Sequence, residues 1–145
     1  MYPDRFEGIR RINHLTSEME SLYHQASLKL GISDSVSIVL YTIYLAGGAC
    51  LLSDIYKKSG VSKQTVNSAM RALESSGIVR LTRHTGRSKK AALTDAGQSY
   101  ARQTVARLYA AEVEAFGAWT RQEIETYIGL MEKYANCLRE QIEKI

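Results

Sequence analysis

Polar side chains that can donate hydrogen bonds lie on one face of a predicted helix near the middle of the sequence. The segment reads SGVSKQTVNSAMRALESSG from Ser59 to Gly77. Val66, Met70 and Leu73 recur at helical spacing and form one apolar stripe, so the opposite face is polar. Its candidate DNA contacts are Lys63, Gln64, Asn67, Ser68 and Arg71. Gln64 and Asn67 have the groups needed to read adenine bidentately, whereas Arg71 suits guanine or a phosphate.

Two more candidate DNA contacts lie at the start of this helix. Ser62 can cap the helix, and Thr65 is placed to bond a phosphate. Gly60 stands where a tight turn from a preceding helix, residues 52–59, needs a positive φ. The pattern predicts a helix-turn-helix, with residues 62–76 as the helix that enters the major groove.

A basic β-hairpin is predicted directly after the second helix. Ile78, Val79 and Leu81 alternate with polar residues, Gly86 marks the tip, and residues 88–93 return. The candidate DNA contacts of this wing are Arg83, His84, Arg87, Lys89 and Lys90. Arg87, beside the tip, is the candidate for the minor groove, and Lys89 and Lys90 for phosphates.

Positive charge is concentrated in this segment. Residues 57–90 contain nine Lys or Arg and one acid, a net charge of +8, whereas the rest of the chain has ten basic and fourteen acidic residues, a net charge of −4. A solvated charged face would mix both signs. The distribution therefore favours a surface that binds a polyanion.

The remaining elements are predicted to be helical. We expect helices at residues 4–30, from the Ser33 cap to about 46, at 95–117 after a Thr94 cap, and from the Thr120 capping box to the C-terminus. The predicted fold class is mainly α: one compact domain in which 33–94 form a winged helix-turn-helix. Residues 1–32 and 95–145 form a helical dimerisation region.

The last helix carries a heptad seam that calls for a partner helix. Its members step by four and three: Ile124, Ile128, Met131, Ala135, Leu138, Ile142 and Ile145. The seam could pack within one chain, but we favour a homodimer. A dimer would present two recognition helices to a palindromic site in double-stranded DNA, whose two half-sites lie about 34 Å apart.

Other classes of function find less support. No nucleophile arrangement, metal-binding cluster or phosphate loop is present in the sequence, so we predict no enzyme activity, no metal and no cofactor. Cys50 and Cys137 are far apart, and whether either is redox-active stays open. An uncharged run at 35–53 approaches transmembrane length, but its Ser, Thr and Gly residues favour a buried core helix. We expect a cytoplasmic protein without a membrane partner.

The sequence resembles the MarR family of bacterial transcriptional regulators. The resemblance rests on VSKQTV, LESSGIVRL and the segment from Gly86 to Gly97, with Leu93, Thr94 and Gly97 at its end. It differs at Thr85, where the family usually has an aspartate that orients the tip arginine, and at Tyr56, where an alanine is usual.

The resemblance implies a dimeric, ligand-responsive regulator, which we expect to be a repressor. It also implies an effector pocket between the dimer helices and the DNA-reading unit, with low-ranking candidates His14, Tyr23, Tyr41 and Tyr44. The alternative is a winged helix that serves as a non-regulatory protein-interaction or scaffolding module, its basic surface binding an acidic partner.

Overall fold

The computed structural model describes residues 2–145, with side chains from Asp4 onward. The first elements are α1 (Tyr2–Leu30), α2 (Asp34–Leu45), β1 (Ala49–Leu51), α3 (Leu52–Lys58) and α4 (Lys63–Ser75). They are followed by β2 (Val79–Arg83), β3 (Lys89–Leu93), α5 (Asp95–Gln103), α6 (Val105–Ala115) and α7 (Arg121–Ile142). This order confirms the predicted fold class, a mainly helical winged helix-turn-helix with long N- and C-terminal helices.

Side-chain caps fix the starts of four helices where the sequence predicts them. The Ser33, Ser62 and Thr94 hydroxyls accept hydrogen bonds from backbone N–H groups in the first turns of α2, α4 and α5. At α7 the Thr120 hydroxyl accepts from Glu123 N at 3.1 Å, and Glu123 Oε1 accepts from Thr120 N at 3.0 Å. This reciprocal pair is a complete capping box.

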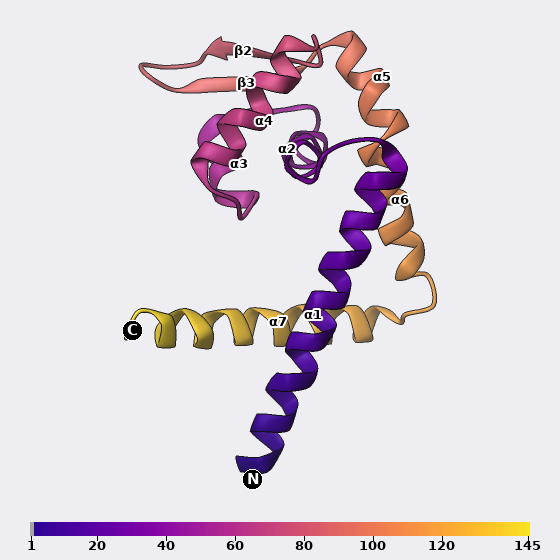
Figure 1. Cartoon of the computed structure of the whole chain (residues 1–145), viewed down its shortest axis with the longest axis vertical. Helices are drawn as coiled ribbons and strands as arrows, with labels where there is room; N and C mark the ends of the chain where they lie inside the picture. Colours follow the sequence, from indigo (N-terminus) through magenta and orange to yellow (C-terminus); the bar gives the residue numbers. More distant parts are fainter. Residues whose placement is uncertain (1) are drawn as a thin grey trace. The chain divides into compact units, whose positions relative to one another are not determined.

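The hydrophobic core holds α2, α3 and α4 against the sheet. Ile43 from α2, Ile55 from α3 and Val66 from α4 are fully buried, and Val79 and Ala91 close the core from the strands. Figure 1 shows the β2–β3 hairpin along one side of this helix cluster, with its tip extending beyond the helices. The core therefore fixes α4 and the base of the wing relative to each other.

The sheet has one strand more than the sequence analysis predicts. Its order is β1-β3-β2, and β1 pairs antiparallel with β3 through Ala49–Ala92, Cys50–Ala91 and Leu51–Lys90. A strand of three residues is too short to show alternation, and its partner lies about forty residues away in the sequence. The pairing ties the start of α3 to the wing.

The predicted single helix over 95–117 is wrong, because the structure divides it into α5 and α6 at Thr104. The backbone of Thr104 leaves the helical region, with φ −123° and ψ −94°. Its hydroxyl donates to Tyr100 O at 2.7 Å, while its N–H bonds to Ala101 O. A threonine hydroxyl that bonds the carbonyl four residues back competes with the helical pattern and bends the helix.

The chain divides into two compact units, one up to Leu108 and the other Tyr109–Ile145. The first contains the winged helix-turn-helix with α1 and α5. In the second, the Trp119 ring lies 4.8 Å from Phe116 and 5.6 Å from Tyr127, between ring centroids, at the turn before α7. Within residues 2–145, no single helix is long and apolar enough to cross a membrane; only α1 and α2 together pass that test, as a pair bent by 89°.

Candidate nucleic-acid interface

Helix α4 buries its apolar stripe and leaves polar side chains on the other face. Val66, Met70 and Leu73 are buried in the core. Lys63, Gln64, Ser68 and Arg71 are exposed, whereas Thr65 and Asn67 are half-buried. The division follows the helical period read from the sequence, with a strong amphipathic contrast between the two faces.

The first turn of α4 uses two of the candidate contacts for its own structure. The Ser62 hydroxyl accepts from Thr65 N at 3.2 Å, and the two hydroxyl oxygens lie 2.9 Å apart. The hydroxyl pair holds Thr65 at the helix N-terminus, where backbone N–H groups and the helix dipole favour an anion such as a phosphate.

Tyr56, on α3, contacts two candidate DNA contacts of α4. Its hydroxyl donates a hydrogen bond to Asn67 Oδ1 at 2.6 Å. The ammonium group of Lys63 lies 5.3 Å from the centre of the Tyr56 ring, within the range of a cation–π interaction. Sequence reasoning noted Tyr56 only as a departure from the family pattern. The signal available in the sequence was a tyrosine on the helix that comes directly before the polar face of α4.

A groove of about 660 Å³ lies between α3, α4 and the wing. Asn67 and Arg71 line it from α4, and Arg87 and Lys89 line it from the wing. The other lining residues are Leu52, Ser53, Tyr56, Met70, Glu74, Leu81 and Ser88. The structure thus brings cations from two predicted elements to one concave surface, which we call the basic groove.

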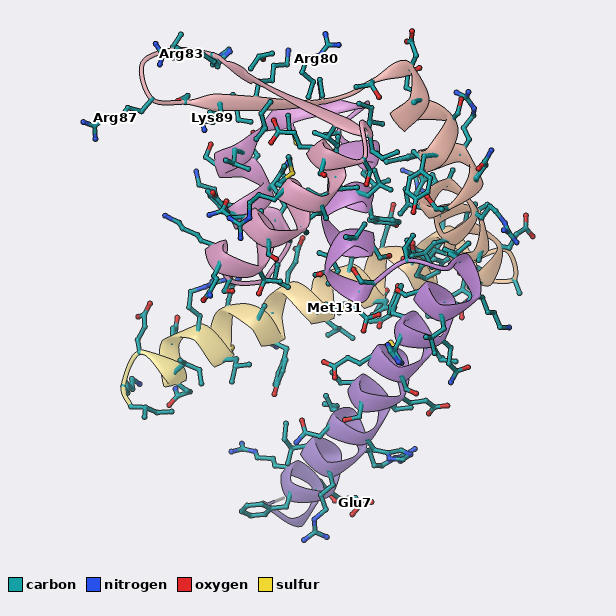
Figure 2. The ribbon with its side chains drawn as sticks, turned by 45° about the horizontal axis from the view of Figure 1, so that its top comes forward. Glu7, Arg80, Arg83, Arg87, Lys89 and Met131 are labelled. Carbon is teal, nitrogen blue, oxygen red and sulfur yellow. The ribbon has the colours of Figure 1, made fainter. Side chains whose placement is uncertain are left out.

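The tip of the wing is a tight turn that presents Arg87. His84 N donates to Ser88 O at 2.9 Å, Ser88 N donates to Thr85 O at 2.9 Å, and Gly86 has φ +56°. Arg83 and Lys89 lie opposite each other in the antiparallel register of β2 and β3. Figure 2 shows Arg87 at the tip, and Arg80 pointing away from the helices. Arg83, His84 and Lys90 are exposed but do not line the basic groove.

The candidates for an effector pocket are spread over α1 and α2. His14 and Tyr23 are exposed on α1, whereas Tyr41 and Tyr44 on α2 pack against the core. The basic groove is lined by none of the four. A smaller hollow of about 280 Å³, near Ile32, Val36 and Tyr100, is lined by none of them either.

The two cysteines have different surroundings. Cys50 is half-buried in β1, and burial raises the pKa of its thiol, with the Asp54 carboxylate adding to the rise. A raised pKa keeps this thiol protonated near neutral pH and lowers its reactivity. Cys137 is exposed on α7.

Together, the buried core of α2–α4, the capped helix α4 and the basic hairpin define a winged helix-turn-helix protein. Residues 30–88 match the family model described as MarR family. No curated protein matches this sequence significantly.

Three solved structures show the same fold at low sequence identity. A MarR family regulator from Neisseria meningitidis is 16% identical with a TM-score of 0.84, over 94% of this chain and 97% of that one. AbsC, a MarR family transcriptional regulator from Streptomyces coelicolor, is 17% identical with a TM-score of 0.74, over 92% and 93%. BpsR from Bordetella bronchiseptica, described with regulation of its DNA binding by 6-hydroxynicotinic acid, is 18% identical with a TM-score of 0.65, over 86% and 98%.

Residues 30–88 thus carry a match to the MarR family, and the chain as a whole has the fold seen in the solved MarR family regulators.

Proposed function

We propose that this protein is a homodimeric repressor that binds a palindromic operator in double-stranded DNA and releases it when a small-molecule effector binds. The observation that carries the proposal is the basic groove, where Arg71 from α4 and Arg87 and Lys89 from the wing line one surface. Lys, Arg and amide side chains gathered in this way suit the phosphates and base edges of a duplex.

Different residues of this surface have different roles in the proposal. Gln64 and Asn67 lie near the N-terminal end of α4, the part of a recognition helix that meets base edges in the major groove. Arg87 enters the minor groove, and Lys89 and Lys90 contact phosphates. Ser68 and Arg71 continue the contact along α4, while Ser62 and Thr65 meet the backbone at its start. Arg83 and His84 extend the contact along the wing.

The dimer is proposed from exposed apolar side chains on the long helices. None of the residues of α7, all of which the structure describes, is buried. Ile128, Met131 and Leu138 of the heptad seam are 51%, 54% and 42% exposed. Such a continuous apolar stripe on a helix requires a partner surface, and a second copy supplies a matching seam. We assign residues 1–32 and 95–145 to dimerisation and 33–94 to DNA binding.

The effector is proposed by analogy with a structural relative. BpsR is described with regulation of its DNA binding by 6-hydroxynicotinic acid. An effector acts if it binds better to dimers whose recognition helices misfit the operator spacing, because it then shifts the population towards them. His14, Tyr23, Tyr41 and Tyr44 remain the proposed surroundings of such a site.

The test of DNA binding is a titration of the full chain against duplexes selected from a random pool, repeated over a series of salt concentrations. We expect a preferred palindromic duplex and an affinity that falls steeply with salt, because bound phosphates release counterions. Lys89→Ala should reduce the slope of log affinity against log salt by about one. The matched control is Lys133→Ala, an exposed lysine on α7 that lies outside the groove.

The alternative function, a winged-helix interaction module, makes the opposite prediction. An acidic protein partner would use the same cations without reading bases. The chain would then bind all duplexes with similar affinity, and Gln64→Ala would not alter any sequence preference. Equal affinity for selected and random duplexes would favour this module over the repressor.

A further inference from the structure

We propose that Tyr56 sets the base that Asn67 reads: its hydroxyl holds the carbonyl oxygen of the asparagine towards α3, so that the amide NH₂ meets the base and favours guanine over adenine. The inference rests on the proposed function, because it assigns a preference at one position of the operator. It changes the expectation from sequence, in which a free Asn67 would read adenine.

The contact is placed to affect recognition. Tyr56 Oη lies 2.6 Å from Asn67 Oδ1, and both side chains are half-buried and line the basic groove. The bond joins α3 to α4 across the turn of the helix-turn-helix, and the two helices are also held by the buried side chains of Ile55 and Val66. The position of the Asn67 amide is therefore fixed before DNA arrives.

The direction of the hydrogen bond decides which group of Asn67 remains for DNA. An asparagine reads adenine by accepting from N6–H and donating to N7 at the same time. In this structure the phenol uses one of the two lone pairs of Asn67 Oδ1 and holds that oxygen towards α3, so the amide NH₂ is the group more available to a base edge. Guanine offers two acceptors in the major groove, O6 and N7, whereas adenine would set its N6 donor against the amide donor.

Tyr56 also holds a neighbouring cation. The Lys63 ammonium lies 5.3 Å from the centre of the Tyr56 ring, one turn before Asn67 on α4. Tyr56→Phe keeps the ring and removes only the hydroxyl, so it keeps Lys63 in place while freeing Asn67 Oδ1. This substitution separates base preference from overall affinity, which should change little because the cation–π contact with Lys63 is kept.

The experiment is selection of duplexes from a random pool with the full-length wild type, Tyr56→Phe, Asn67→Ala and Tyr100→Phe. Asn67→Ala identifies the operator position that Asn67 reads, since the preference there disappears. Tyr100→Phe is the matched control, because this half-buried tyrosine lies on α5 outside the basic groove. Circular dichroism verifies that each variant is folded.

We expect guanine at that position for the wild type and for Tyr100→Phe. In Tyr56→Phe, the ratio of guanine to adenine affinity should fall by at least about fivefold. Any of three results would overturn the inference while leaving DNA binding intact. The wild type could select a base other than guanine, Tyr56→Phe could leave the ratio of guanine to adenine affinity unchanged, or Asn67→Ala could leave the base preference at every operator position unchanged. A wild type that selects no site at all would overturn the proposed function, and the inference with it.

Discussion

Gly97 packs against the backbone of Ile78 so closely that a Cβ at position 97 would lie 1.9 Å from the Ile78 carbonyl oxygen. The N–H of Gly97 also donates to the Thr94 hydroxyl at 2.9 Å. Thr94 and Gly97 thus form one joint between the wing and α5. The glycine that carries part of the family resemblance has a steric reason here, because a side chain would push α5 away from the segment that precedes β2.

Gly97→Ala should therefore destabilise the protein, by about 1–3 kcal/mol, since the added methyl group meets backbone that has little freedom to move. The control is Gly8→Ala in α1, where a Cβ meets nothing within 4 Å. It should be neutral or stabilise by about 0.5–1 kcal/mol, because alanine loses less backbone entropy in a helix. Thermal unfolding measures both. Equal stability of Gly97→Ala and wild type would contradict the packing argument.

A pH-dependent contact links α1 to the first turn of α2. His24 Nδ1 lies 2.7 Å from Asp34 Oδ2, and this hydrogen bond, helped by Ser27, holds the pKa of the Asp34 carboxyl below its ordinary value of 3.8. Because the folded-state pKa is the lower one, ionised Asp34 adds to stability above pH 3.8. That contribution is lost as the pH falls through the folded-state pKa.

His24→Ala should raise the pKa of Asp34 towards its ordinary value, as an NMR titration of the carboxyl carbon would show. His14→Ala is the control, because His14 lies on the same helix and is exposed. A pKa that does not respond to His24→Ala would mean that the contact is too mobile in solution to affect the carboxylate.

The sequence predicted best where the signal is local. The caps at Ser33, Ser62, Thr94 and Thr120 occur as expected because each uses a side chain within three residues of its donor. The break at Thr104 escaped prediction, since its residues fit a continuous helical pattern and the deciding hydroxyl bond appears only in the folded chain.

The sequence predicts which residues of the candidate site are exposed better than it predicts which of them contact each other. The periodicity of α4 separates buried Val66 and Met70 from exposed Gln64 and Arg71. It cannot show that Asn67 is already bonded to Tyr56, because that contact depends on how α3 crosses α4. Likewise, β1 exists only because β3 is beside it.

Arg87 and Gln64 should have separable effects on DNA binding. Arg87→Ala should weaken binding to all duplexes alike, because a cation at the wing tip acts through the backbone and the shape of the minor groove. Gln64→Ala should weaken the preferred duplex by about 1–3 kcal/mol and leave random duplexes nearly unchanged, because it removes a contact to a base edge. Competition titrations with selected and random duplexes measure both. Identical effects of the two variants on every duplex would show that these roles are wrongly assigned.

The heptad seam of α7 provides the last prediction. Leu138 is 42% exposed in the single chain, and a dimer formed through the seam would bury it against a partner helix. Leu138→Asp should place a carboxylate in that apolar contact and convert the dimer to a monomer, measured by sedimentation at several protein concentrations. Lys133→Asp adds the same side chain off the seam on the same helix, where it should leave the dimer intact.

The Leu138→Asp monomer should also lose most of its affinity for a palindromic duplex, because the two half-sites of the duplex would no longer be bound together. A Leu138→Asp protein that remains dimeric would show that the seam packs within one chain, and that dimerisation, if it occurs, uses another surface.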